Sequence, residues 1–248
     1  MKTMLIYAVA ILEFTQGLLA QDAGITKSLQ FTRTSNQSLS LPAGSIGLWN
    51  HRKFAVAVWF KQDSTGVHRF FVSQGIGVNT SPDWSFIFEL SPGNWMEAYT
   101  LKPTGFNGKI RSLAKYTDTN KHCAMFIHDM DLPTVDQLQL WLDGSRLPTS
   151  VYQPPSEAAF NSLRSFYIGG GNNPAYAFNG KLCSVAMFSG TLPTYSQVFT
   201  ADKKPKDLTG LPGRIFWERG DRTPLTTDEV LPTLWNNLNG VTQSTEIP

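Results

Sequence analysis

The order of strands and turns is most readable in residues 137–192, QLQLWLDGSRLPTSVYQPPSEAAFNSLRSFYIGGGNNPAYAFNGKLCSVAMFSGTL. The segment opens with alternating leucines that close on an Asp-Gly pair at 143–144, a pair typical of tight hairpins. A short apolar run leads into three glycines at 169–171, and a last apolar strand follows Asn-Gly at 179–180. The glycines suit loop positions of positive φ, and since no helix follows them they lack the context of a phosphate-binding loop. The segment therefore predicts architecture and indicates no chemistry.

Period-two alternation of apolar residues also dominates the rest of the chain. Residues 53–61, KFAVAVWFK, are apolar on both faces, which predicts a strand in the middle of a sheet. Residues 95–101 and 121–128 alternate in the same way, whereas residues 194–201, TYSQVFTA, predict one short helix with Thr194 as its N-cap. The fold class predicted is all-β: two antiparallel sheets packed as a sandwich, with one short helix near the C-terminal end.

Composition limits the number of domains and the class of partner. The chain has 248 residues, a net charge of +2 and 12% aromatic residues, which is typical of a β-rich globular domain. The densest basic run is KKPK at 203–206, too short for a nucleic-acid footprint, and it reads as a solvated linker. We expect one sandwich domain over residues 24–201 and an extension, residues 202–248, that packs on it.

The first twenty residues have the layout of a targeting segment. Lys2 precedes an apolar run at 4–12, and small residues follow at Gly17 and Ala20. This arrangement predicts that residues 1–20 are a signal peptide, and hence that the protein is secreted. The alternative is that the same residues form an uncleaved apolar arm. The run is too short to span a bilayer, and no later segment is apolar enough to do so.

Two cysteines, Cys123 and Cys183, predict one disulfide, because an even count is typical of exported proteins. Alternation along their strands places each thiol on the apolar side, as a bridge within a core requires. The alternative is two separate buried thiols. Two cysteines without clustered partners cannot complete a zinc site, so no metal is expected there.

Four motifs in order resemble a known family. They are SLQFTRTSNQSLSLP (28–42), FAVAVWFK (54–61), LQLWLDGSRL (138–147) and FYIGGGNNPAYAFNGKLCSVAMFSGTLPTYSQV (166–198). Together they resemble the laminin-G-like, concanavalin-A-like and pentraxin-like jelly-roll superfamily over residues 25–201. The resemblance implies a sandwich of two antiparallel sheets, one of them concave. Members of that superfamily also place two cysteines as this chain does, one before the Asp-Gly hairpin and one in the closing strand.

The resemblance also suggests tests for catalysis. Glycoside hydrolases of this fold carry two catalytic carboxylates in a Glu-x-Asp-x-(x)-Glu strand motif, which this sequence lacks. Gly-x-Ser-x-Gly is also missing. The four histidines stand singly in the sequence, at His51, His68, His122 and His128. We therefore predict that the protein is not an enzyme.

Calcium is the one cofactor that the resemblance raises. Relatives often hold Ca²⁺ at the rim of a sheet, and Asp129, Asp131 and Asp136 supply hard oxygen ligands in one loop. Their spacing does not match a dedicated calcium motif, so a solvated acidic loop is the favoured interpretation. We expect no cofactor, with calcium at this loop as the alternative.

The best candidate ligand site is the hairpin segment of Asn94, Trp95, Glu97 and Tyr99. Aromatic rings stack on the apolar face of a sugar, while amide and carboxylate groups bond its hydroxyls. The competing interpretation makes Trp95 and Tyr99 core residues, with Glu97 at an edge.

These observations predict a non-catalytic, extracellular binding or adhesion module for a glycan or protein partner. An alternative is a virion-surface, capsid-decoration or filament subunit that self-assembles through the same sandwich and its two chain ends. A polysaccharide-active enzyme comes third. N-terminal sequencing separates the first two, because a secreted module begins near Gln21 and an assembly subunit begins at Met1.

Overall fold

The computed structural model describes residues 24–42, 44–45, 50–75, 85–102, 105–158, 165–171, 173–221, 236–238, 240–246 and 248. The segment 1–20, predicted to be a signal peptide or an apolar arm, lies outside the described residues and that prediction stays open. Within them no helix is long and apolar enough to cross a membrane.

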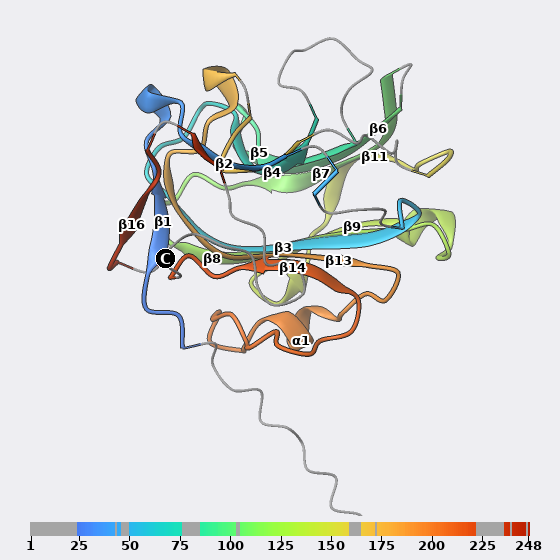
Figure 1. Ribbon diagram of the computed structural model, residues 1–248. Coiled ribbons are helices and arrows are strands. Elements are labelled where there is room, and N and C mark those ends of the chain that lie inside the picture. Colours follow the sequence, from blue (N-terminus) through green and yellow to red (C-terminus); the bar gives the residue numbers. More distant parts are fainter. Residues whose placement is uncertain are drawn as a thin grey trace, which may run out of the picture.

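Two eight-stranded antiparallel sheets pack face to face (Figure 1). The first has the order β10-β9-β8-β3-β13-β1-β16, and β14 also pairs with β13. Its strands are β1 (Ser28–Phe31), β3 (Lys53–Gln62), β8 (Lys121–Asp129), β9 (Leu138–Leu142), β10 (Ser145–Arg146), β13 (Gly180–Ser189), β14 (Arg214–Glu218) and β16 (Thr242–Ser244). As predicted, β3 is central, lying between β8 and β13.

The second sheet has the order β11-β7-β6-β5-β4-β12-β2-β15. Its strands are β2 (Ser38–Leu41), β4 (Arg69–Gln74), β5 (Phe86–Leu90), β6 (Trp95–Lys102), β7 (Gly105–Lys115), β11 (Thr149–Gln153), β12 (Phe166–Ile168) and β15 (Asn236–Leu238). Short 3₁₀ turns connect strands at η1 (Arg33–Ser35), η2 (Thr134–Asp136) and η3 (Pro174–Tyr176), and α1 (Tyr195–Val198) is a single short helix. The predicted all-β sandwich with one short helix near the C-terminal end is confirmed.

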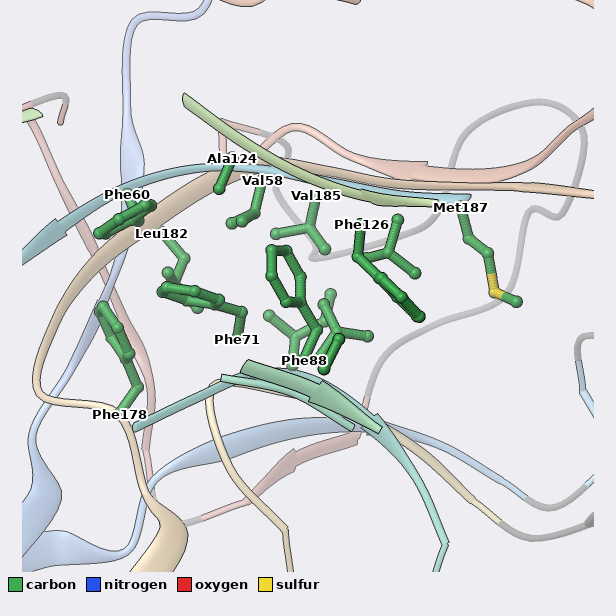
Figure 2. Packing of buried hydrophobic residues seen from close by; sticks show 14 of the residues in the cluster. Val58, Phe60, Phe71, Phe88, Ala124, Phe126, Phe178, Leu182, Val185 and Met187 are labelled. Carbon is green, nitrogen blue, oxygen red and sulfur yellow. The ribbon is translucent and has the colours of Figure 1, made fainter. Parts of the chain in front are cut away.

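Aromatic side chains from both sheets fill the core (Figure 2). Phe60 of the first sheet meets Phe71 of the second at 4.6 Å between ring centroids, and Phe126 meets Phe88 at 6.0 Å. All four are fully buried. Burial of one such ring contributes about 1.5–3 kcal/mol, so this layer dominates the stability of the sandwich.

A second apolar layer explains why β3 is hydrophobic on both sides. The face of β3 turned away from the core carries Ala57 and Trp59, which pack in a cluster with Phe199 and Leu208 from the segment after α1. Figure 1 shows α1 and this segment below the first sheet. The residues after 202 also add β14 and β16 to the first sheet and β15 to the second.

The predicted disulfide is absent: Cys123 and Cys183 are both free and buried. Both thiols lie in the outer cluster, Cys123 beside Met125 and Ile127 as alternation predicts. Cys183 departs from simple alternation, because an irregularity in β13 after it sends Val185 and Met187 to the inner core instead. However, each cysteine lies opposite Trp59, one on β8 and one on β13, with β3 between them. Two strand spacings of about 4.8 Å separate the Cα atoms by roughly 9–10 Å, beyond the roughly 7 Å that a disulfide spans.

Reducing agent is therefore expected to leave the melting temperature of the purified protein unchanged. A structural disulfide contributes about 2–5 kcal/mol, so its reduction would lower the Tm by several degrees. The measurement is thermal unfolding with and without dithiothreitol. Alkylation in denaturant without reductant, read by mass spectrometry, should label both Cys123 and Cys183. A fall in Tm together with unlabelled cysteines would contradict the structure.

Candidate functional site

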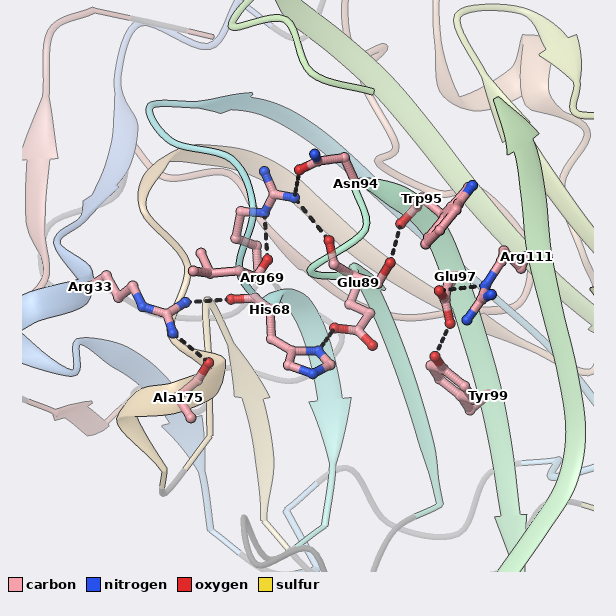
Figure 3. A network of polar contacts seen from close by, with 12 residues as sticks. Arg33, His68, Arg69, Glu89, Asn94, Trp95, Glu97, Tyr99, Arg111 and Ala175 are labelled. Carbon is pink, nitrogen blue, oxygen red and sulfur yellow. Dashed lines mark hydrogen bonds and ion pairs between the residues drawn. The ribbon is translucent and has the colours of Figure 1, made fainter. Parts of the chain in front are cut away.

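The face of the second sheet that points away from the core carries the residues that the sequence singled out. Met96 and Ala98 of β6 point into the core, so alternation turns Trp95, Glu97 and Tyr99 to the opposite side. All three side chains thus share one face, as predicted. Figure 3 shows Trp95, Glu97 and Tyr99 along β6, with Arg111 of β7 beside Glu97.

Asn94 comes just before this row and performs a structural task. It ends the turn that begins at Ser91 and has a left-handed backbone with φ of 65°. Its Oδ1 accepts hydrogen bonds from the Gly66 N–H at 2.8 Å and from Arg69 Nη2 at 2.8 Å. The side-chain oxygen predicted to bond a sugar hydroxyl is therefore used within the protein.

Strand β7 places a cation opposite each residue of the row. In the antiparallel register, Trp95 pairs with Lys115, Glu97 with Arg111 and Tyr99 with Lys109. The Lys115 ammonium is 4.8 Å from the centroid of the Trp95 ring, and the Lys109 ammonium is 4.9 Å from that of Tyr99. Such cation–π contacts contribute about 0.5–1 kcal/mol at exposed sites, so they mainly hold rings and cations in fixed positions.

Glu97 is the centre of this arrangement and is fully buried. It accepts a hydrogen bond from Arg111 Nε at 2.6 Å, lies 3.6 Å from Lys109 Nζ, and also accepts from the Tyr99 hydroxyl. A buried carboxylate needs this degree of pairing, because the desolvation of an unpaired charge is very costly. Glu97 thus orients the cations around it.

A second carboxylate, Glu89 on β5, lies directly opposite Glu97 in the sheet and is 2% exposed. Burial raises the pKa of Glu89 above its ordinary value, and the hydrogen bond from His68 opposes that rise. The His68 Nδ1 is 2.6 Å from the Glu89 carboxylate. Like charges directly opposite each other destabilise a sheet. The separate partners of the two glutamates offset that repulsion.

Aromatic side chains extend the face at both ends. Phe106 at the start of β7 is 54% exposed and lies 5.3 Å from the Tyr99 ring. On the β4 side, Phe70 stacks on Tyr176 of η3 at 4.7 Å. The face therefore combines one exposed ring, several partly covered rings, and charged groups held in place.

Sequence reasoning missed the cations of β7 and Phe106. The alternation of Lys109, Ile110 and Arg111 is a strand signal, since Ile110 is buried in the core and both cations point outward. That signal could have placed them on one face. Their position beside Trp95, Glu97 and Tyr99 depends on the register between β6 and β7.

The acidic loop predicted as the alternative calcium site is occupied by cations of the protein. Lys53 Nζ lies 3.0 Å from Asp129 and 3.6 Å from Asp131, and Arg146 Nη1 lies 2.6 Å from Asp136. Among the residues that the structure describes, no group of three or more His, Cys, Asp or Glu side chains is placed to hold a metal ion.

Another charged cluster lies at one end of the first sheet. His122 of β8 lies 2.8 Å from Asp143 and 2.9 Å from Asp118, and Lys203 lies 2.9 Å from Asp143. Burial lowers the His122 pKa, but the two carboxylates outweigh it and the net pKa is raised. This cluster ties the Asp-Gly hairpin turn to the C-terminal segment and belongs to the architecture.

Solved structures give two strong matches to the fold. A putative carbohydrate binding protein from Bacteroides ovatus matches with a TM-score of 0.60 and 14% identity, over 89% of this chain and 60% of that protein. A native heptameric SAP-like pentraxin from Limulus polyphemus matches with a TM-score of 0.55 and 12% identity, over 88% of this chain and 94% of the pentraxin. At such identities the likeness concerns the fold alone.

No curated protein matches the chain in sequence. A family model does match, over residues 33–195, and its description is the concanavalin A-like lectin/glucanases superfamily. The match runs from η1 to the first residue of α1 and so covers most of both sheets. The sequence motifs, the two antiparallel sheets and this match agree, and the chain belongs to the concanavalin A-like lectin/glucanases superfamily.

Proposed function

We propose that this protein is a non-catalytic glycan-binding module that works outside the cell. Its binding surface is the outward face of β6 and β7, named here the β6–β7 face and made of Trp95, Tyr99, Phe106, Lys109, Arg111 and Lys115 around Glu97. The observation that carries the proposal is the register that sets the rings of β6 beside the hydrogen-bonding cations of β7. Sugars present both an apolar ring face and hydroxyl groups, so a surface of this kind suits them.

The state of the two carboxylates favours binding over hydrolysis. A glycosidase needs one carboxyl group that donates a proton and a second that attacks or activates water, both in reach of the scissile bond. Glu89 and Glu97 are 2% and 0% exposed, and side chains of the protein, His68 and Arg111, already bond them. They are placed to support the face, and we expect no sugar release from polysaccharides.

The comparisons supply a second line of support. The superfamily includes lectins, and the match from Bacteroides ovatus is described as a putative carbohydrate binding protein. The extracellular location rests on the signal-like residues 1–20, Lys2 followed by an apolar run. N-terminal sequencing of the protein from its source tests that location, and a start near Gln21 is expected.

Replacing Phe106 with alanine is expected to weaken glycan binding by about fivefold, the loss of one aromatic contact. Phe106 is 54% exposed, so the change should leave folding intact. The measurement is a glycan array with the full-length protein, followed by titration calorimetry on the glycans that bind.

The matched control is Val135→Ala, which trims another exposed apolar residue, 69% exposed, in η2 away from the β6–β7 face. Val135→Ala should bind as the unmodified protein does. If the array shows no binding at all, the proposed function is wrong. Equal loss in both variants would place the site elsewhere.

A further inference from the structure

Arg111 is the most strongly positioned cation on the β6–β7 face. Its Nε donates to the fully buried Glu97 at 2.6 Å, and its guanidinium carbon lies 4.7 Å from the centroid of the Trp95 ring. These two contacts fix both the direction and the plane of the guanidinium. Such a group loses little conformational entropy when it binds a ligand.

The terminal nitrogens of Arg111 are left for a ligand. In the part of the chain that the structure describes, the Nε bond to Glu97 is the one hydrogen bond made by this guanidinium. The side chain is 27% exposed, so solvent reaches part of it. A guanidinium fork of two N–H groups matches the two oxygens of a carboxylate, or two oxygens of a sulfate.

The net charge of the β6–β7 face also favours an anionic ligand. Lys109, Arg111 and Lys115 lie across from one carboxylate, Glu97. Lys115 is exposed, and among the described residues its contact is with the Trp95 ring and no acid neutralises it. The face therefore carries more positive than negative charge and attracts anions.

We propose that the glycan bound by the β6–β7 face is anionic, with a carboxylate or sulfate group held in the fork of Arg111 and supported by Lys115. This inference rests on the proposed glycan-binding function and names the class of its ligand. The sugar ring that carries the anion lies along the aromatic side chains, and the exposed ring of Phe106 takes a neighbouring sugar. The rings favour a glycan over an acidic peptide, because a carboxylate alone would need no aromatic partner.

The test uses paired probes that differ in charge alone. Oligogalacturonate is compared with the same oligomers after methyl esterification, and a sulfated galactan is compared with its desulfated form. Titration calorimetry with the full-length protein should show at least tenfold tighter binding to one charged probe than to its neutral counterpart. Binding to that probe should weaken as salt rises, because screening reduces attraction between exposed charges. The probe pair with the larger ratio identifies the anion as carboxylate or sulfate.

Two substitutions place the anion on the protein. Lys115→Gln removes an exposed charge with no ion pair, so the variant should fold normally. It should bind the charged probe about fivefold more weakly. Arg111→Lys keeps a positive charge near Glu97 but loses the guanidinium fork. Its affinity for the charged probe should be about tenfold lower. Each change should weaken binding of the charged probe by a larger factor than binding of its neutral counterpart.

Lys121→Gln is the matched control, since Lys121 is an exposed lysine at the start of β8 on the first sheet. It should bind all probes as the unmodified protein does. This control separates the effect of a charge on the β6–β7 face from the effect of the protein's net charge. Equal affinity for charged and neutral probes, unaffected by Lys115→Gln, would overturn the anionic ligand and leave glycan binding standing. If neither these probes nor the glycan array shows binding, both proposals fall together.

Discussion

Replacing Arg69 with alanine is expected to lower the free energy of unfolding by about 4 kcal/mol. This is the larger of the two stability losses predicted below. Arg69 is fully buried at the start of β4. Its guanidinium donates to five acceptors, which come from two stretches of the chain, residues 62–67 and 91–94. They are the carbonyls of Val67 at 3.0 Å, Ser64 at 2.7 Å and Ser91 at 3.1 Å, Asn94 Oδ1 at 2.8 Å, and Gln62 Oε1.

The position of these acceptors explains the size of the effect. Gln62 belongs to β3 of the first sheet, whereas Ser91 and Asn94 form the turn between β5 and β6 of the second. Through Gln62, Arg69 thus joins the two sheets at one end of the sandwich. Figure 3 shows its contact with Asn94 within the second sheet. Without Arg69, two buried acceptors, Gln62 Oε1 and the Ser91 carbonyl, lose this donor, and each unsatisfied buried group costs about 1–3 kcal/mol. The three partly buried acceptors add less, because water can replace the guanidinium there.

Desolvation works against Arg69 but does not cancel its contribution. Burial lowers the pKa of the guanidinium to about 10, so part of its hydrogen-bond energy offsets the cost of holding the charge out of water. The group still carries its proton at neutral pH. Arg69→Met, which restores volume without donors, should recover part of the packing energy and remain well below the unmodified protein.

Urea unfolding followed by tryptophan fluorescence measures these differences. Arg52→Ala is the matched control, because Arg52 is 56% exposed and lies 3.9 Å from Asp131, an ion pair of the weak surface class. It should change stability by less than about 0.5 kcal/mol. If Arg69→Ala were as stable as Arg52→Ala, the buried arginine would not join the sheets energetically.

The second large effect is a loss of about 3 kcal/mol of stability between pH 6.5 and pH 4, caused by His128. His128 lies on the core side of β8, opposite Phe54 of β3, and its ring stacks on Phe54 at 4.9 Å. It is fully buried, and neither ring nitrogen has a hydrogen-bond partner of ordinary geometry among the described residues. Burial lowers its pKa to about 4, although the nearby Asp129 acts in the opposite direction.

The sign follows from the proton balance. Below pH 6.5 an unfolded chain protonates His128, while the folded protein keeps the ring neutral until about pH 4. The unfolded state then binds more protons, so stability falls as the pH falls through this window. Above about pH 7.5 the ring is neutral in both states, and the residue causes no pH dependence.

His128→Phe isolates this contribution, because phenylalanine keeps the stack on Phe54 and does not titrate. The difference in unfolding free energy between the variant and the unmodified protein, measured in urea at pH 4.5 and 7.5, should favour the variant by roughly 2–3 kcal/mol more at the acid value. Parallel stability curves across that range would contradict a neutral buried His128.

His122 on the same strand gives a contrasting reference. Its pKa is raised by Asp143 and Asp118, so its stabilising contribution is complete below pH 6.5 and is lost as the pH rises through the folded pKa. His122→Phe should therefore alter the alkaline side of the curve, whereas His128→Phe alters the acid side. The pKa values of two histidines on one strand are thus shifted in opposite directions, because their neighbours differ.

Much of the architecture is predictable from local pattern. The two apolar faces of residues 53–61 predict a central strand, and β3 has a sheet neighbour on each side. The Asp-Gly turn at 143–144 joins β9 to β10, with Asp143 and Gly144 both at positive φ. Gly169 has φ of 76°, a backbone conformation that glycine adopts without strain. These features depend on neighbours in sequence, and pattern therefore suffices.

The features that local sequence pattern could not predict have one cause. Alternation cannot tell that β13 is irregular after Cys183, nor that β3 lies between the strands of Cys123 and Cys183. Local pattern likewise cannot show that Asp129 of the acidic loop pairs with Lys53, which comes from another strand, and calcium at this loop stays an untested alternative. In each case the deciding neighbour is distant in sequence.

The candidate site likewise has features that local pattern predicts and features that depend on distant residues. The sequence by itself determined the sandwich, the central strand, and the common face of Trp95, Glu97 and Tyr99, because alternation along one strand is local geometry. Only the tertiary structure decided that Glu97 is buried and that Arg111 and its neighbouring lysines pair with this row. The register between β6 and β7 makes that choice, and register depends on the packing of both strands against the core.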